Sequence, residues 1–152
     1  MKSLWKCCKT VQSSKATHPT SEQMVEIKSC YSNWNHSVET NAAPEGFDCV
    51  EECVYSKLGF MGTDKTINKE KLLQFQKEET HEDFHEAITK SMDMCMGKTF
   101  TTKCPSGIDA VIKCEAIQIY LNCPAKHWDN GDDCQETKKL MEKCADVTSM
   151  YN

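Results

Sequence analysis

Residues 81–85 read HEDFH and fit the HExxH pattern of zinc peptidases. In that pattern two histidines one helical turn apart hold a zinc ion, and the glutamate activates a water molecule as general base. The longer form of the pattern also needs glycine at position 88 and histidine at position 91, where this chain has Ile88 and Ser91. Glu115 could supply a ligand from further along the chain, but it lies in a segment that we expect to be a core helix.

The same residues also fit the start of a helix that needs no metal. Thr80 can cap such a helix, and Glu82 and Asp83 then lie in its first turn, where the helix dipole favours carboxylates. We therefore predict that HEDFH binds no zinc, and that the chain has no catalytic residue, metal or cofactor. The sequence also lacks a GxSxG nucleophile elbow, and Cys7 and Cys8 are not followed by the His-Asp pair of secreted phospholipases.

The charge pattern argues against a partner with phosphate groups. The 152 residues carry a formal net charge of -5, and all 18 basic residues are lysines. Arginine supplies the planar pair of donors that recognises guanine and phosphate, so its absence argues against nucleic acid as a partner. A chain of this length favours one domain with its own core.

Cysteine is the most informative residue type, with 11 in the chain. So many cysteines are typical of secreted proteins, and none of them forms the CxxC spacing of a zinc ribbon or a redox centre. The start of the chain, MKSLWKCCKT, lacks the apolar run of a signal peptide, so we expect that a secretion signal has already been removed. No apolar stretch is long enough to predict a membrane span.

Apolar residues recur at helical spacing along most of the chain without a comparable strand pattern, which predicts an all-α fold. Thr20 and Gln23 form a capping box in front of the first helix, and Asn68 caps a later one. Pro105 is expected near the start of the most apolar helix, and Pro124 after its end. The predicted helices comprise residues 20–34, 47–58, 68–79, 80–95, 105–121 and 135–147.

Cys49 and Cys53 lie one helical turn apart in the second predicted helix. Their Cβ atoms would be roughly 5 to 6 Å apart, beyond the roughly 3.8 Å that a disulfide spans. The two cysteines must therefore bond to different parts of the chain, and this helix is fixed against two neighbours.

The order and spacing of the cysteines resemble those of the insect odorant-binding proteins. The six cysteines that carry this pattern are Cys30, Cys49, Cys53, Cys95, Cys114 and Cys123. Three further cysteines, Cys104, Cys134 and Cys144, together with Pro124, are similar to the additions of the Plus-C subfamily. The resemblance covers about residues 20–147.

The resemblance implies about six or more helices, cross-linked by disulfides, around an apolar cavity. The implied bonds are Cys30–Cys53, Cys49–Cys114 and Cys95–Cys123. The cysteines left without an assigned partner are Cys7, Cys8, Cys104, Cys134 and Cys144. Because 11 is an odd number, at least one thiol is free or bonds to another molecule. We expect a helical core over residues 20–123, an N-terminal segment over residues 1–19, and a C-terminal extension over residues 124–152 whose extra helix lies on the core.

The resemblance implies a secreted carrier that reversibly binds odorants, pheromones or lipid-like molecules, in olfaction or another transport role. The implied partners are a small hydrophobic or amphipathic ligand and a chemosensory receptor, with the carrier as a monomer or homodimer. The apolar residues that we expect to line the cavity are Met24, Ile27, Leu72, Phe75, Phe84, Ile88, Met92, Val111, Ile117, Tyr120 and Trp128. For each of them, ordinary core packing is the competing interpretation.

A second function remains open on the sequence alone. A disulfide-rich secreted protein can also act through its surface, as an interaction protein or a toxin-like protein. Uptake of a small apolar molecule would separate a carrier from such a protein.

Overall fold

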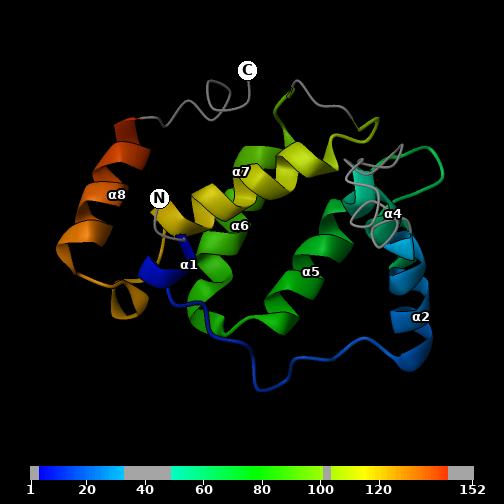
Figure 1. The fold of residues 1–152 in the computed structure, drawn as a ribbon, viewed down its shortest axis with the longest axis horizontal. Coiled ribbons are helices and arrows are strands. Elements are labelled where there is room, and N and C mark those ends of the chain that lie inside the picture. The colour runs from blue at the N-terminus through cyan, green and yellow to red at the C-terminus, as the bar shows by residue number, and fades with distance from the viewer. Residues whose placement is uncertain (1–3, 33–48, 101–103, 144–152) are drawn as a thin grey trace.

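The computed structural model describes residues 4–32, 49–100 and 104–143, and in these ranges it confirms the all-α class. Apart from isolated bridges, the described backbone contains no paired strands. The α-helices are α1 (Leu4–Cys7), α2 (Ser21–Cys30), α4 (Val50–Lys57), α5 (Lys69–Glu79), α6 (His85–Met96), α7 (Ile108–Leu121) and α8 (Asp132–Lys143). Two 3-10 turns, η2 (Glu82–Phe84) and η3 (Ala125–His127), precede α6 and follow α7. α7 lies against α6, with α8 at one end of the molecule and α2 and α4 at the other (Figure 1).

Local sequence signals set the starts of two helices as predicted. The Thr20 hydroxyl accepts a hydrogen bond from Gln23 N at 3.2 Å, and the Gln23 side chain accepts one from Thr20 N at 2.9 Å, which completes the capping box of α2. The Asn68 side chain accepts from Lys71 N at 3.0 Å in front of α5. These caps satisfy backbone N–H groups that the first turn of a helix leaves without partners.

The start of the helix after α5 differs from the prediction. Thr80 does not cap it, because Thr80 is the C-cap of α5 and the next turn begins one residue later than predicted, at Glu82. His81 caps the 3-10 turn η2 instead, with its Nδ1 accepting from Asp83 N at 3.3 Å. The α-helix proper, α6, begins only at His85.

Two later boundaries also differ. α7 begins at Ile108 rather than at Pro105, because Gly107 adopts a left-handed conformation with φ 69° that interrupts the helical backbone. α8 begins at Asp132 rather than at Gln135, and its acidic first turn is favoured by the helix dipole. The predicted end of the first helix at position 34 is wrong, because α2 ends at Cys30, where Tyr31 N donates to the carbonyl oxygen of Lys28 at 3.1 Å. The predicted limits at positions 47 and 147 lie outside the described residues.

The core consists of two apolar clusters. The large cluster lies mainly between α6 and α7, and its buried residues are Cys7, Cys8, Met61, Phe84, Ile88, Cys95, Ile108, Val111, Cys114, Ile117, Tyr120, Cys134 and Met141. The small cluster is formed by Phe60, Leu72 and Met92. A set of partly buried residues, which we call the seam, packs against both clusters. The seam comprises Tyr55, Ile67, Leu73 and Met96.

α7 is buried on more than one face because α4, α6 and α8 all contact it. The predicted inward positions Ile108, Val111 and Ile117 are buried. Glu115 and Gln118 are buried as well, with exposed fractions of 4% and 5%. Polar side chains on such a helix need hydrogen-bond partners inside the protein.

Five disulfides use all ten cysteines in the described part of the chain. The bonds are Cys7–Cys134, Cys8–Cys123, Cys30–Cys53, Cys49–Cys104 and Cys95–Cys114. The bond between Cys30 and Cys53 is the one that the resemblance implied. Because Cys49 bonds to Cys104, the prediction that Cys49 and Cys53 have different partners is confirmed. Cys144 lies outside the described residues.

The other two implied pairings are wrong, and the helix arrangement gives the reason. These pairings were Cys49–Cys114 and Cys95–Cys123. Because α6 lies along α7, Cys95 meets Cys114 inside the large cluster, with 5.8 Å between their Cα atoms. Cys123 lies beyond the end of α7, where the N-terminal segment places Cys8 with 5.9 Å between the Cα atoms.

The segment that precedes α2 runs along the ends of other elements. Lys9 N donates to the carbonyl oxygen of His127 at 2.9 Å, and Ser13 N donates to that of Glu79 at 2.9 Å. These two hydrogen bonds attach the segment to η3 and to the end of α5. The disulfides of Cys7, in α1, and of Cys8, the next residue, attach it further.

Candidate functional site

The HEDFH residues do not form a zinc-binding helix face. His81 precedes η2 and His85 begins α6, so the two histidines are not separated by one turn of continuous α-helix. His85 Nε2 lies 2.8 Å from the carbonyl oxygen of Lys77 and 3.0 Å from that of Thr80, and it donates toward them. Among the described residues, no group of three or more His, Cys, Asp or Glu side chains could hold a metal ion.

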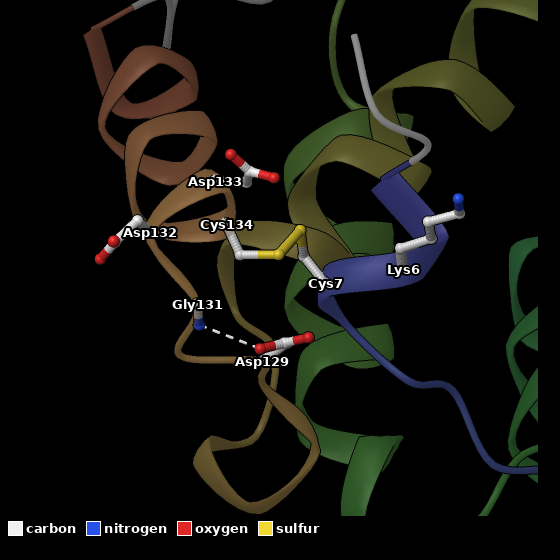
Figure 2. A pocket seen from close by; sticks show the side chains of 7 residues that line it. All are labelled: Lys6, Cys7, Asp129, Gly131, Asp132, Asp133 and Cys134. Carbon is white, nitrogen blue, oxygen red and sulfur yellow. Dashed lines mark hydrogen bonds between the residues drawn. A yellow bond between two sulfur atoms is a disulfide. The ribbon is translucent and has the colours of Figure 1, made fainter.

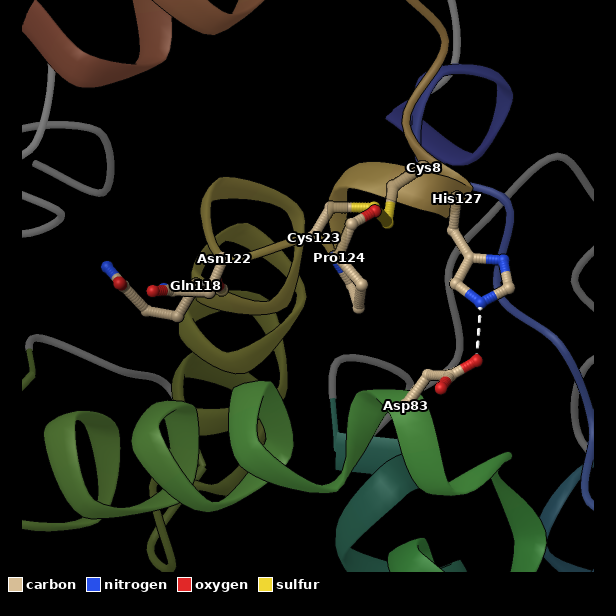
Figure 3. The surroundings of a disulfide bond; sticks show 7 residues. All are labelled: Cys8, Asp83, Gln118, Asn122, Cys123, Pro124 and His127. Carbon is tan, nitrogen blue, oxygen red and sulfur yellow. Dashed lines mark hydrogen bonds and ion pairs between the residues drawn. A yellow bond between two sulfur atoms is a disulfide. The ribbon is translucent and has the colours of Figure 1, made fainter.

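Asp83 of the same motif forms a charged cluster with η3. Its Oδ2 lies 2.8 Å from His127 Nε2 (Figure 3). The same oxygen lies 2.6 Å from Lys126 Nζ and 2.9 Å from His81 Nδ1. The hydrogen bond from His127, followed by that from Lys126, lowers the pKa of Asp83 to about 2. The cluster fastens the start of α6 to the segment after α7, next to the Cys8–Cys123 bond. Sequence reasoning missed it because its partners lie 44 residues apart.

The structure divides the expected cavity-lining residues into three sets. Six of them belong to the large cluster or pack against it: Phe84, Ile88, Val111, Ile117, Tyr120 and Trp128. Three belong to the small cluster or pack against it: Leu72, Phe75 and Met92. Met24 and Ile27, on α2, belong to neither cluster, and Met24 is 39% exposed. The structure therefore brings most of the expected residues into two adjoining groups rather than one.

The seam between the clusters opens at the protein surface. A depression of about 420 Å³ is lined by Ile67 and Met96 of the seam, together with Phe100 and Val111. Lys98 is among the polar residues of its lining. Sequence reasoning missed the seam because its residues come from α4, the loop before α5, α5 and α6, and no single helical pattern connects them. An apolar molecule that reached this depression would meet Val111 of the large cluster and the two seam residues, which pack against both clusters.

A buried polar pair adjoins the seam. Gln76 Nε2 of α5 donates to Glu115 Oε2 of α7 at 3.0 Å. Burial raises the pKa of Glu115. Burial, followed by the charges of Glu115 and Glu51, raises the pKa of the seam residue Tyr55 to about 12. The seam residue Leu73 lies one helical turn before Gln76 on α5, which places the pair next to the seam.

A second depression, of about 460 Å³, lies between α1 and the start of α8 (Figure 2). Its lining is polar, with Lys6 on one side and Asp129, Asp132 and Asp133 on the other, and the Asp132 side chain points away from the Cys7–Cys134 bond. Asp129 Oδ1 accepts from Gly131 N at 2.9 Å, so this carboxylate shapes the turn before α8. None of the described residues that line this depression has an aliphatic or aromatic side chain, whereas several such side chains line the opening at the seam. The opening at the seam is the better candidate.

Comparison with known proteins agrees with the cysteine pattern. General odorant-binding protein 68 of Anopheles gambiae is 23% identical to this chain over 119 residues. The aligned stretch covers 68% of this chain and 56% of that protein, so the chain spans little more than half the length of this relative. No protein-family model and no solved structure matches the chain. The similarity supports the resemblance to the insect odorant-binding proteins.

Proposed function

We propose that this chain is a carrier that reversibly takes up small apolar or amphipathic molecules between its two apolar clusters. The observation that carries the proposal is the seam, because Ile67 and Met96 pack against both clusters and also line an open depression. A ligand that parts the clusters there would replace contacts between apolar side chains with contacts to itself. The name of the similar mosquito protein supports binding of odorants rather than catalysis.

The physical scale of such binding is sufficient for a carrier. Transfer of apolar surface out of water gains about 25 cal/mol for each Å², so a molecule that buries roughly 300 Å² gains about 7 kcal/mol. A free energy of this size corresponds to binding in the micromolar range. The disulfides between helices would hold the frame together while the seam opens, because they do not depend on apolar contacts.

The finer features of the proposal rest on the resemblance. They are secretion, membership of the Plus-C subfamily, a role in olfaction, delivery to a chemosensory receptor, and a monomeric or homodimeric state. The division into an N-terminal segment, a helical core and a C-terminal extension belongs to the same proposal. None of the helices in the described residues is long and apolar enough to cross a membrane.

The test is uptake of diphenylhexatriene, a hydrocarbon dye that fluoresces when it leaves water, by the oxidised protein. We expect saturable uptake with micromolar affinity and no chemical change of the dye. The variant Met96→Trp should fill the opening of the seam and weaken uptake about tenfold or more. The matched control is Leu140→Trp, since Leu140 on α8 is 58% exposed and belongs to neither cluster.

Two outcomes would contradict the carrier. If the wild-type protein takes up no dye, the chain acts through its surface, as an interaction or toxin-like protein would. If Met96→Trp and Leu140→Trp weaken uptake equally, the dye binds elsewhere than the seam.

A further inference from the structure

Half-buried Gln76 and buried Glu115 form a polar pair in which two acceptor oxygens have no hydrogen-bond donor. Their one hydrogen bond, from Gln76 Nε2 to Glu115 Oε2, leaves Gln76 Oε1 and Glu115 Oε1 without partners, although both atoms are buried. Glu115 as a whole is only 4% exposed. The described part of the chain therefore links Gln76 of α5 to Glu115 of α7 by one hydrogen bond and gives the remaining acceptor oxygen of each side chain no donor.

Buried acceptors without donors destabilise a protein, because they have lost their hydrogen bonds to water. A ligand group that donates a hydrogen bond would replace the hydrogen bonds to water that these oxygens lost on burial. Aldehydes, ketones, ethers and esters carry acceptors alone and would face these oxygens with lone pairs. Alcohols and amines carry O–H or N–H groups and would complement them.

The pair also lies at the right place to meet one end of a ligand. The charge of Glu115 acts on Tyr55, which packs against both apolar clusters. Leu73, another residue of the seam, lies one helical turn before Gln76 on α5. Neither Gln76 nor Glu115 lines the open depression, so a chain-like molecule would have to extend inward between the clusters for its leading end to reach the two acceptors.

We propose that the Gln76–Glu115 pair is the polar anchor of the ligand site and selects amphipathic molecules whose polar end is a hydrogen-bond donor, an alcohol or an amine. This inference rests on the carrier function proposed above. It adds the class of ligand, which neither the cysteine pattern nor the similar protein specifies.

The experiment compares ligands that differ only in the polar end. Decanol, decylamine and methyl decyl ether are used in turn to displace diphenylhexatriene from the wild-type protein. The ether keeps the oxygen but has no donor, so decanol should bind about tenfold more tightly, the difference that one well-placed hydrogen bond makes. Decylamine distinguishes a charged donor from a neutral one. If the protein prefers decylamine over the ether by a larger factor than it prefers decanol over the ether, an ammonium group pairs with an ionised Glu115.

Glu115→Gln is the decisive variant because it changes hydrogen bonding with little change of size. The new amide can donate to Gln76 Oε1 while it accepts from Gln76 Nε2, so the pair closes on itself and offers less to a ligand. The preference for decanol over the ether should fall about tenfold, to near equality. The matched control is Gln118→Met, which removes another buried polar side chain of α7, 5% exposed, and should retain the preference.

Thermal unfolding of each variant shows whether the fold is kept, and Gln76→Met gives a second way to remove an acceptor if Glu115→Gln fails to fold. Equal affinity of the wild-type protein for decanol and the ether overturns the anchor, as does a preference that survives in both anchor variants. In either case, continued uptake of the dye leaves the carrier function standing. Absence of dye uptake by the wild-type protein overturns both proposals.

Discussion

α2 and the pair formed by α6 and α7 are all helices with apolar residues at regular spacing, yet they end in opposite environments. η2, α6 and α7 bury Phe84, Ile88 and Ile117, respectively, in the large cluster. α2 has no buried residue, and Val25 on it is 68% exposed. The difference teaches that apolar spacing predicts a helix but not how deeply that helix is buried, because burial depends on how many other elements cover it.

The largest expected effect comes from truncating one apolar side chain to alanine in each region and comparing the loss of stability. Phe84→Ala should lower the free energy of unfolding by about 3 to 5 kcal/mol, because Phe84 is fully buried and its loss leaves a cavity. Met24→Ala on α2 should lower it by less than about 0.5 kcal/mol, the scale of surface substitutions. Urea unfolding of the oxidised variants measures both values, and similar losses would show that α2 belongs to the same packed core.

The disulfides of the two regions give a sharper comparison. Cys95–Cys114 and Cys30–Cys53 close loops of similar length, with sequence separations of 19 and 23. Loop entropy therefore predicts similar stabilisation, about 3 kcal/mol each. Replacing Cys95 and Cys114 with alanine should cost about 1 kcal/mol more than replacing the other pair, because both sulfur atoms leave the interior of the large cluster. Thermal unfolding of the two double variants tests this order, and its reversal would contradict the account.

Capping should matter more to α2 than its apolar residues do. Thr20→Ala removes the side-chain half of the capping box and should destabilise α2 by about 1 kcal/mol, more than Met24→Ala. Amide hydrogen exchange should show faster exchange in α2 and little change in α7. Thr20→Ser, which keeps the hydroxyl, is the control, and equal exchange in all three proteins would refute a role for the cap.

The smallest expected effect concerns pH and the Asp83 cluster. The pKa of Asp83 is lowered from 3.8 to about 2, so its ionised form is favoured in the folded protein. The stabilisation is present above pH 3.8 and is lost as the pH falls toward about 2. The melting temperature of the wild-type protein should therefore fall more steeply across this range than that of Asp83→Asn. Parallel pH profiles would show that the cluster does not couple to folding.

Features encoded by neighbouring residues could be predicted from the sequence, and features that depend on helix crossing could not. The caps at Thr20 and Asn68 were predicted because each involves residues three apart. The spacing of Cys49 and Cys53 predicted that they could not bond to each other. Their actual partners depend on which elements meet, and the implied partner of Cys49 was wrong for that reason.

The candidate site was predicted only in part for the same reason. Periodicity identified Ile88 and Val111 as inward residues, but it could not show that the apolar residues divide into two clusters. Ile67 precedes α5 in a loop and carries no helical signal, although it joins both clusters. Glu115 was considered as a metal ligand, whereas the structure pairs it with Gln76.

The disulfide between Cys7 and Cys134 also determines how the molecule would respond to mechanical force. These cysteines are 127 residues apart in sequence and lie near the two ends of the described chain. A pulling force applied outside them would pass through the sulfur bridge, and α2, α4, α5, α6 and α7 would carry no load. Reduction of the disulfides would release roughly 400 Å of extensible chain, at roughly 3.4 Å for each residue. The chain between these two cysteines is therefore nearly inextensible while the bond is intact, and its compliance is set by a chemical bond rather than by the helices that it spans.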